Sequence, residues 1–208
     1  MDLKDVNPPI VAILRGVQPD EVVDIAEALL EAGIRAIEVP LNSPAPLISV
    51  ERLCAAFGDR ALCGAGTVLS PGDVDDVAER GGRLIVTPNC DTAVIERAVA
   101  RGLVVMPGFT SPTEAFAAVK AGAEALKLFP AGSYGPGHLK AIKDVLPARI
   151  ACYAVGGVGA DTMESWIAAG AAGFGIGGEI YRPGMTAETV KKRAETLVAA
   201  YIRAAAGK

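Results

Sequence analysis

The stretch Ala125-Leu126-Lys127-Leu128-Phe129-Pro130-Ala131 is a short apolar run with a single lysine at its centre. Its length and the glycine and proline that bound it predict a buried strand of a parallel sheet. Lysine is seldom buried, because removing an ammonium group from water costs free energy. Burial therefore lowers the pKa of a lysine, and a neutral amine is a nucleophile that can form a Schiff base with a carbonyl. The alternative is a lysine at an exposed strand edge, with its stem on the core and its head in water.

Apolar runs of this kind recur along the whole chain and alternate with amphipathic segments of helical spacing. The eight runs are Ile10–Leu14, Ala36–Val39, Leu62–Ala65, Leu84–Thr87, Val104–Met106, Ala125–Leu128, Ala151–Val155 and Gly173–Ile176. This alternation predicts an α/β fold, a (β/α)8 TIM barrel that forms a single domain over residues 1–208. An open doubly wound sheet also alternates, but no G-x-G-x-x-G follows the first run. A leucine-rich solenoid requires L-x-x-L-x-L spacing, which is absent.

Four segments between the runs are typical of helix N-termini. They are Gln18-Pro19-Asp20, Ser43-Pro44, Ser70-Pro71-Gly72-Asp73 and Ser111-Pro112-Thr113-Glu114. In the last of these, the serine is expected to cap the helix, the proline to take its first position, and the glutamate to complete a capping box.

The composition narrows the class of protein and of partner. The chain has 208 residues, is 51% hydrophobic, and carries a net charge of −4 with acidic and basic residues interspersed. We therefore expect no nucleic-acid or membrane partner. We also expect no signal peptide and no apolar run long enough to span a bilayer. Four scattered cysteines without a C-x-x-C pair indicate reduced thiols in a cytoplasmic protein. One histidine and no cluster of His and Cys predict no zinc site. The pattern leaves a hard cation on carboxylates open, and our expectation is neither a metal nor a cofactor.

Active sites of (β/α)8 barrels lie at the carboxyl ends of the strands. Glu38 stands between Ile37 and Val39 just as Lys127 stands between two leucines. Successive strand residues point to opposite faces, so both charged side chains are expected in the lumen while their apolar neighbours face the helices. An acid and a base would then share a partly dry cavity. The alternative is a buried ion pair that only fixes the packing.

Paired glycines follow the seventh and eighth runs, at Gly156-Gly157 and Gly177-Gly178. Bare backbone N–H groups at such turns bind phosphate, and these two loops are the usual phosphate site of the fold. The glycines could instead serve only tight turns and close packing. Arg15 follows the first run and could hold a carboxylate through two hydrogen bonds, or form a surface ion pair.

Several runs, taken in order along the chain, carry a family resemblance. They are Val11–Gly16, Ile37–Pro44, Gly64–Leu69, Val86–Asn89, Met106–Gly108, Leu126–Ala131 and Val155–Val158. As a set, these runs resemble the class I 2-dehydro-3-deoxy-phosphogluconate/phosphogalactonate (KDPG/KHG-type) aldolases, over nearly the whole chain. The resemblance implies a cofactor-free lyase that acts on a phosphorylated 2-keto-3-deoxy sugar acid, and a homotrimer.

The resemblance also implies a role for each residue at the carboxyl ends of the strands. Lys127 would form the Schiff base and Glu38 would donate and accept protons. Arg15 and Thr67 would hold the pyruvyl carboxylate, with Pro88 and Phe129 shaping the pocket. The phosphate would lie on Gly156, Gly157, Gly177 and Gly178.

Two positions resemble the phosphogalactonate branch of the family. Pro40-Leu41-Asn42-Ser43 stands where the gluconate branch has T-L-R-T, and Val155 replaces a threonine before the glycine pair. Exchange of a hydroxyl for a methyl alters which C4 epimer can be hydrogen-bonded. The implied reaction is cleavage of the galactonate substrate to pyruvate and D-glyceraldehyde 3-phosphate. Gly178 departs from relatives with Ser or Asp there, so a side-chain contact to phosphate is lost.

Three other functions are compatible with parts of the pattern. The first is an aldolase for 2-dehydro-3-deoxy-6-phosphogluconate or 4-hydroxy-2-oxoglutarate. The second is a barrel sugar-phosphate isomerase or epimerase, which needs acid–base groups but no covalent lysine. The third is a phosphosugar-binding module without catalysis.

Overall fold

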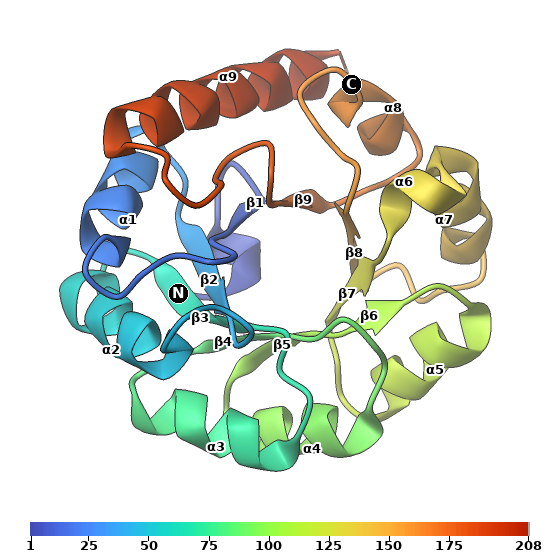
Figure 1. Ribbon diagram of the computed structural model, residues 1–208. Coiled ribbons are helices and arrows are strands. Elements are labelled where there is room, and N and C mark those ends of the chain that lie inside the picture. The colour runs from blue at the N-terminus through green and yellow to red at the C-terminus, as the bar shows by residue number, and fades with distance from the viewer. Residues whose placement is uncertain (208) are drawn as a thin grey trace.

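Parallel strands form a closed inner ring, and helices surround it on the outside (Figure 1). The computed structural model describes residues 1–207. The strands are β1 (Ile10–Ile13), β2 (Ala36–Pro40), β3 (Leu62–Gly66), β4 (Leu84–Val86), β5 (Val104–Met106), β6 (Gly108–Phe109), β7 (Ala125–Leu128), β8 (Ala151–Val155) and β9 (Gly173–Ile176). The helices are α1 (Val22–Glu31), α2 (Pro46–Phe57), α3 (Pro71–Glu79), α4 (Thr92–Ala100), α5 (Pro112–Lys120), α6 (Ala131–Tyr134), α7 (Pro136–Lys143), α8 (Met163–Ala168) and α9 (Ala187–Ala206), preceded by the 3₁₀ turn η1 (Leu3–Asp5).

The ring closes where β5 and β6 meet. The sheet order is β5-β4-β3-β2-β1-β9-β8-β7-β6, so its two outer members are consecutive in the chain and separated only by Pro107. Proline has no N–H to donate to a ladder, which accounts for the interruption. Its carbonyl still accepts a hydrogen bond from the Lys127 N–H at 2.8 Å. β5 and β6 are therefore one barrel strand in two pieces, and the prediction of a (β/α)8 barrel is confirmed.

Side chains of alternate strand residues form two separate apolar layers, as the period of a strand requires. The inner layer fills the lumen with residues that include Val11, Leu62, Met106 and Tyr153. The outer layer packs the strands against the helices and includes Ile37 and Leu126. No helix within residues 1–207 combines the length and the apolar character needed to cross a membrane.

Helix starts agree with the sequence at two of the four predicted positions. Ser70 and Ser111 each accept a hydrogen bond from the N3 backbone and complete a capping box, with Asp73 and Glu114 respectively. The predicted start at Ser43-Pro44 is wrong, because α2 begins at Pro46 and the Ser43 hydroxyl instead accepts from the Gly16 N–H. The start at Gln18-Pro19-Asp20 is displaced, because a turn precedes α1 at Val22.

Candidate active site

Lys127 and Glu38 lie on opposite sides of the barrel and both face its lumen. Three barrel strands separate β2 from β7 in either direction around the ring. Ala36 and Ala125, two residues before the charged pair, belong to the lumen layer. Glu38 is 2% and Lys127 6% exposed. Within the part of the chain that the structure describes, neither residue is in a salt bridge. The two groups therefore act on each other's pKa without being joined in a direct ion pair.

Burial lowers the pKa of Lys127 to about 8. Desolvation of the ammonium form is the main cause, the Glu38 carboxylate opposes it, and the Arg15 cation adds to it. The amine also lies 4.9 Å from the centre of the Phe129 ring. A lysine with a pKa near neutrality holds an appreciable fraction of free amine at pH 7, which is the state that attacks a carbonyl.

Burial raises the pKa of the Glu38 carboxyl to about 7, while Lys127, Arg15 and the Gly66 backbone act in the opposite direction. The carboxylate lies directly against Gly66, and a Cβ atom there would be 2.0 Å from Oε2. Oε2 is buried and has no hydrogen-bond partner among residues 1–207. A carboxyl group with a pKa near 7 and an oxygen free to bond is suited to both accepting and donating a proton.

The positive charge of Arg15, in the loop after β1, lies near Lys127 and Glu38. Its charge affects the pKa of both Lys127 and Glu38, although the residue itself is exposed. Its Nη1 donates to Asn42 Oδ1 at 2.5 Å. No carboxylate of residues 1–207 forms a salt bridge with it. The guanidinium can therefore bind an external anion.

A cavity of about 560 Å³ lies beside these groups, at the carboxyl ends of β1, β8 and β9. It is lined by Ile13, Arg15, Phe129, Val155, Gly156, Gly157, Val158, Gly159, Asp161, Thr162, Gly175, Gly177, Gly178 and Glu179. Seven of the residues predicted from the sequence thus border one space: Arg15, Phe129, Val155 and both glycine pairs.

Backbone donors in this cavity are free. The N–H groups of Gly157, Val158, Gly178 and Glu179 donate to no acceptor within residues 1–207. The carbonyl of Gly178, by contrast, accepts from Arg182 Nε at 2.9 Å and from Arg193 Nη1 at 3.2 Å. The turn after β9 therefore has its carbonyl bound and its N–H groups free, an arrangement that favours an anion such as phosphate.

Thr67 and Pro88 follow β3 and β4 at the same end of the barrel, but they do not line this cavity. Thr67 has φ 55°, an uncommon conformation for a residue with a branched side chain. Such strain is typical of functional sites, and it lies next to the glycine that contacts Glu38. The substrate contacts assigned to Thr67 and Pro88 remain predictions.

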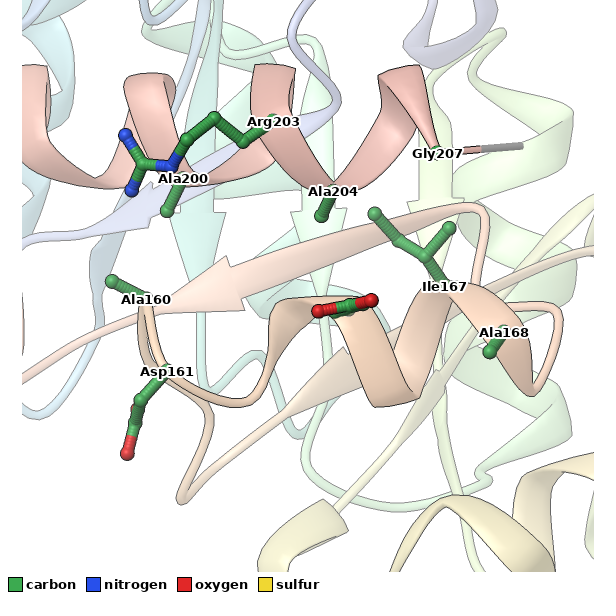
Figure 2. Close-up of a pocket in the computed structure, with 9 residues that line it drawn as sticks. Ala160, Asp161, Ile167, Ala168, Ala200, Arg203, Ala204 and Gly207 are labelled. Atoms are coloured by element: carbon green, nitrogen blue, oxygen red, sulfur yellow. The ribbon is translucent and has the colours of Figure 1, made fainter.

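Two further cavities lie away from the charged pair. One, of about 710 Å³, is at the opposite end of the barrel and includes Leu103, Glu124 and Ala172, which precede strands. The other, of about 380 Å³, lies between α8 and α9 in the helical layer, where Figure 2 shows Ile167 and alanines with Asp161 and Arg203. Neither contains Arg15, whose charge acts on both Lys127 and Glu38, or Phe129, whose ring is 4.9 Å from the Lys127 amine. The cavity of about 560 Å³ contains both residues, so contact with the charged pair and not cavity size identifies the site. No group of three or more His, Cys, Asp or Glu side chains in residues 1–207 is placed to hold a metal ion.

Two neighbours of these residues, Gly66 and Asn42, have no role predicted from the sequence. Gly66 had a place in the motif Gly64-Ala65-Gly66-Thr67, but its contact with Glu38 depends on how β2 and β3 are aligned. Asn42 was expected at the carboxyl end of the second strand, within a segment that departs from the gluconate branch, but without a role. The signal available for both was their position directly after or at the end of a barrel strand.

Comparison with known proteins identifies the family to which this site belongs. The family model described as KDPG and KHG aldolase matches residues 3–194. The chain belongs to this aldolase family. Aldolases are lyases, so the protein is a member of a family of enzymes and its (β/α)8 barrel is the family fold.

Individual members of the family are similar to this chain over nearly the whole length of both proteins. The 2-dehydro-3-deoxy-6-phosphogalactonate aldolase of Escherichia coli (strain K12) is 49% identical over 193 residues, covering 93% of this chain and 94% of that protein. A solved structure described as native KDPGal is 48% identical with a TM-score of 0.94, covering 95% of this chain and 96% of that one. The KDPG aldolase of Legionella pneumophila, with pyruvate captured as a covalent carbinolamine, is 27% identical with a TM-score of 0.79, covering 94% and 93%.

Proposed function

We propose that the protein is a class I aldolase that cleaves 2-dehydro-3-deoxy-6-phospho-D-galactonate to pyruvate and D-glyceraldehyde 3-phosphate. The observation that carries this proposal is a desolvated lysine opposite a protonatable glutamate in the lumen, beside a cavity with free backbone N–H groups. The relative from Escherichia coli, with 49% identity over nearly all of both chains, supports the choice of substrate.

The reaction begins when neutral Lys127 attacks the C2 carbonyl carbon of the substrate. The amine nitrogen passes one proton to the resulting oxygen and Glu38 donates a second, so that water leaves and an iminium forms. The Glu38 carboxylate then accepts the proton of the C4 hydroxyl. The C3–C4 bond breaks, its electrons form the enamine on the pyruvyl fragment, and the aldehyde product leaves. Glu38 returns the proton to C3. Water then hydrolyses the iminium, which releases pyruvate and neutral Lys127, and the proton set free returns to the Glu38 carboxylate.

The remaining residues bind and orient the substrate. Arg15 and Thr67 hold the carboxylate of the pyruvyl part, while Pro88 and Phe129 shape the pocket around it. The phosphate accepts hydrogen bonds from the backbone at Gly156, Gly157, Gly177 and Gly178. Because the turn at Gly178 contributes no side chain, phosphate recognition there depends on the backbone. Val155 sits before the first glycine pair and presents a methyl group toward the cavity where a threonine would present a hydroxyl.

Assembly and location complete the proposal. The family resemblance supports a homotrimer of this one barrel domain, and the four free cysteines within residues 1–207 agree with a cytoplasmic enzyme. Light scattering should then report three times the chain mass of 21.2 kDa. A monomeric mass in an active preparation would contradict the trimer, but it would leave the proposed reaction unchanged.

The substrate is tested by comparing kcat/KM for the two C4 epimers, galactonate and gluconate, with pyruvate release as the signal. We expect the galactonate epimer to be preferred, and Val155→Thr to shift the ratio toward the gluconate epimer by about tenfold. Equal values for the two epimers in the wild-type protein would remove the branch assignment and favour a general KDPG or 4-hydroxy-2-oxoglutarate aldolase.

A further inference from the structure

The loops that follow β1 and β2 are joined by two hydrogen bonds between neighbouring residues. Arg15 Nη1 donates to Asn42 Oδ1 at 2.5 Å, and the Gly16 N–H donates to Ser43 Oγ at 2.9 Å. Ser43 is 8% exposed, so its bond to the Gly16 backbone is shielded from water. The loop after β2 thus holds the loop after β1 at two points, the backbone of Gly16 and the side chain of Arg15.

The partner that holds Arg15 is neutral. Within residues 1–207, no acidic side chain forms a salt bridge with this arginine, although its charge reaches both Lys127 and Glu38. A guanidinium has five N–H donors in a rigid plane, and its long stem has about 2 kcal/mol of rotamer entropy. The bond to Asn42 restrains that freedom, uses one donor and leaves the charge unpaired. Other donors remain available for a bidentate carboxylate.

We propose that Asn42 is a positioning residue, whose amide oxygen holds the Arg15 guanidinium at the mouth of the barrel without neutralising it, so that Arg15 can bind the carboxylate of the oxo acid. Ser43 assists by fixing the Gly16 backbone beside it. The identity of the carboxylate ligand rests on the proposed function, whereas the restraint of Arg15 by Asn42 does not.

Two substitutions separate position from charge. Asn42→Ala removes the acceptor and releases the guanidinium, so Arg15 becomes mobile. Asn42→Asp keeps the shape and the acceptor but adds a negative charge, so Arg15 stays in place and is paired internally. The matched control is Gln18→Ala, which removes an exposed amide side chain from the same loop as Arg15; that side chain makes no hydrogen bond within residues 1–207.

The experiment measures the mobility of the Arg15 Nε–H group by ¹⁵N relaxation, with the signal assigned through Arg15→Lys. It also measures pyruvate binding by calorimetry and, in the aldol-addition direction, KM for pyruvate and kcat. We expect Arg15 to be ordered in wild type, Gln18→Ala and Asn42→Asp, and mobile in Asn42→Ala. Pyruvate Kd and KM should rise about tenfold in Asn42→Ala and at least as much in Asn42→Asp, with kcat nearly unchanged.

Two results would overturn the inference. One is an Arg15 group as ordered in Asn42→Ala as in wild type. The other is wild-type affinity for pyruvate in Asn42→Asp, since an internally paired arginine should not bind a second carboxylate at full strength. If wild type itself fails to bind pyruvate, the proposed function is wrong, and the mobility of Arg15 still decides whether Asn42 positions it.

Discussion

The carboxylate of Glu38 lies against the backbone of Gly66, so closely that a Cβ atom at residue 66 would be 2.0 Å from Oε2 and 2.3 Å from Oε1. Glycine is therefore required on β3 to leave space for the acid on β2. The contact sets where the carboxyl group can stand in the lumen, and the Gly66 backbone also lowers the carboxyl pKa against the larger effect of burial.

Gly66→Ala should displace the Glu38 carboxylate and reduce turnover by roughly 10²-fold, because a general acid–base group acts only within hydrogen-bonding reach. The measurement is steady-state kcat at saturating substrate. The control is Gly72→Ala in α3, whose Cβ would meet only Ser70 Oγ at an ordinary 3.7 Å. Normal turnover in Gly66→Ala would mean that the position of Glu38 does not matter.

Glu38→Gln should separate covalent capture from turnover. The amide is nearly isosteric but cannot exchange the proton, so we expect kcat to fall by roughly 10²–10⁴-fold. Pyruvate should still be trapped on the lysine by borohydride, because the amine itself is unchanged. Near-normal turnover in this variant would exclude the glutamate from proton transfer.

Much of this site could be predicted from the sequence because two charged residues stand at the centre of apolar strands. The alternation of strand side chains placed Glu38 and Lys127 in the lumen, and the structure confirms that placement. The glycine pairs after β8 and β9 also border one cavity, as predicted. In each case a local pattern was enough. The alternation of strand side chains decides which residues face the lumen, and the shared direction of the strands decides at which end of the barrel their loops lie.

Other features depend on contacts between segments that are distant in sequence. The expected helix cap at Ser43 is instead an acceptor for Gly16, 27 residues away. The fit of Gly66 to Glu38 depends on the β2–β3 register, in which Glu38 pairs with Gly64. The short β6 after Pro107 was not predicted, because two residues carry no periodic signal. Such features become visible only once the barrel is packed, and a local sequence pattern cannot predict them.

The pH dependence of pyruvate capture should report the pKa of Lys127. With that pKa lowered to about 8, roughly a tenth of the amine is neutral at pH 7, so the trapping rate should rise with pH through a midpoint near 8 and level off at about pH 9. In Arg15→Gln the midpoint should move to higher pH, because a cation that disfavours the ammonium form is lost. Trapping is measured at saturating pyruvate between pH 6 and 10.

The control for this measurement is Arg203→Gln, which removes an exposed arginine on α9 that borders the cavity of Figure 2 and not the lumen. Its midpoint should equal that of wild type. A midpoint in Arg15→Gln that stays in place or moves to lower pH would contradict the electrostatic role given to Arg15.

Lys127→Met should stabilise the fold near neutral pH. The folded-state pKa of about 8 lies below the ordinary value of 10.5, so the unfolded chain binds more protons between these values. Wild-type stability from this group therefore rises as pH increases from about 8 to 10.5, and its cost is complete below pH 8. Methionine removes that cost, on the order of 1–3 kcal/mol.

This effect is measured by urea unfolding at pH 7.5 and pH 10. The variant should exceed wild type at pH 7.5 by more than at pH 10. An unfolding free energy lower than that of wild type at pH 7.5 would show that the lysine is not desolvated at a cost to the fold.

Reductive trapping shows whether the buried amine of Lys127 forms a covalent bond with the oxo acid. The protein is incubated with pyruvate and sodium borohydride at pH 8, digested, and mapped by mass spectrometry. We expect a single reduced pyruvyl adduct on Lys127, and none in Lys127→Met. An adduct on another lysine, or no adduct in a preparation that turns over substrate, would show that Lys127 is not the Schiff-base residue.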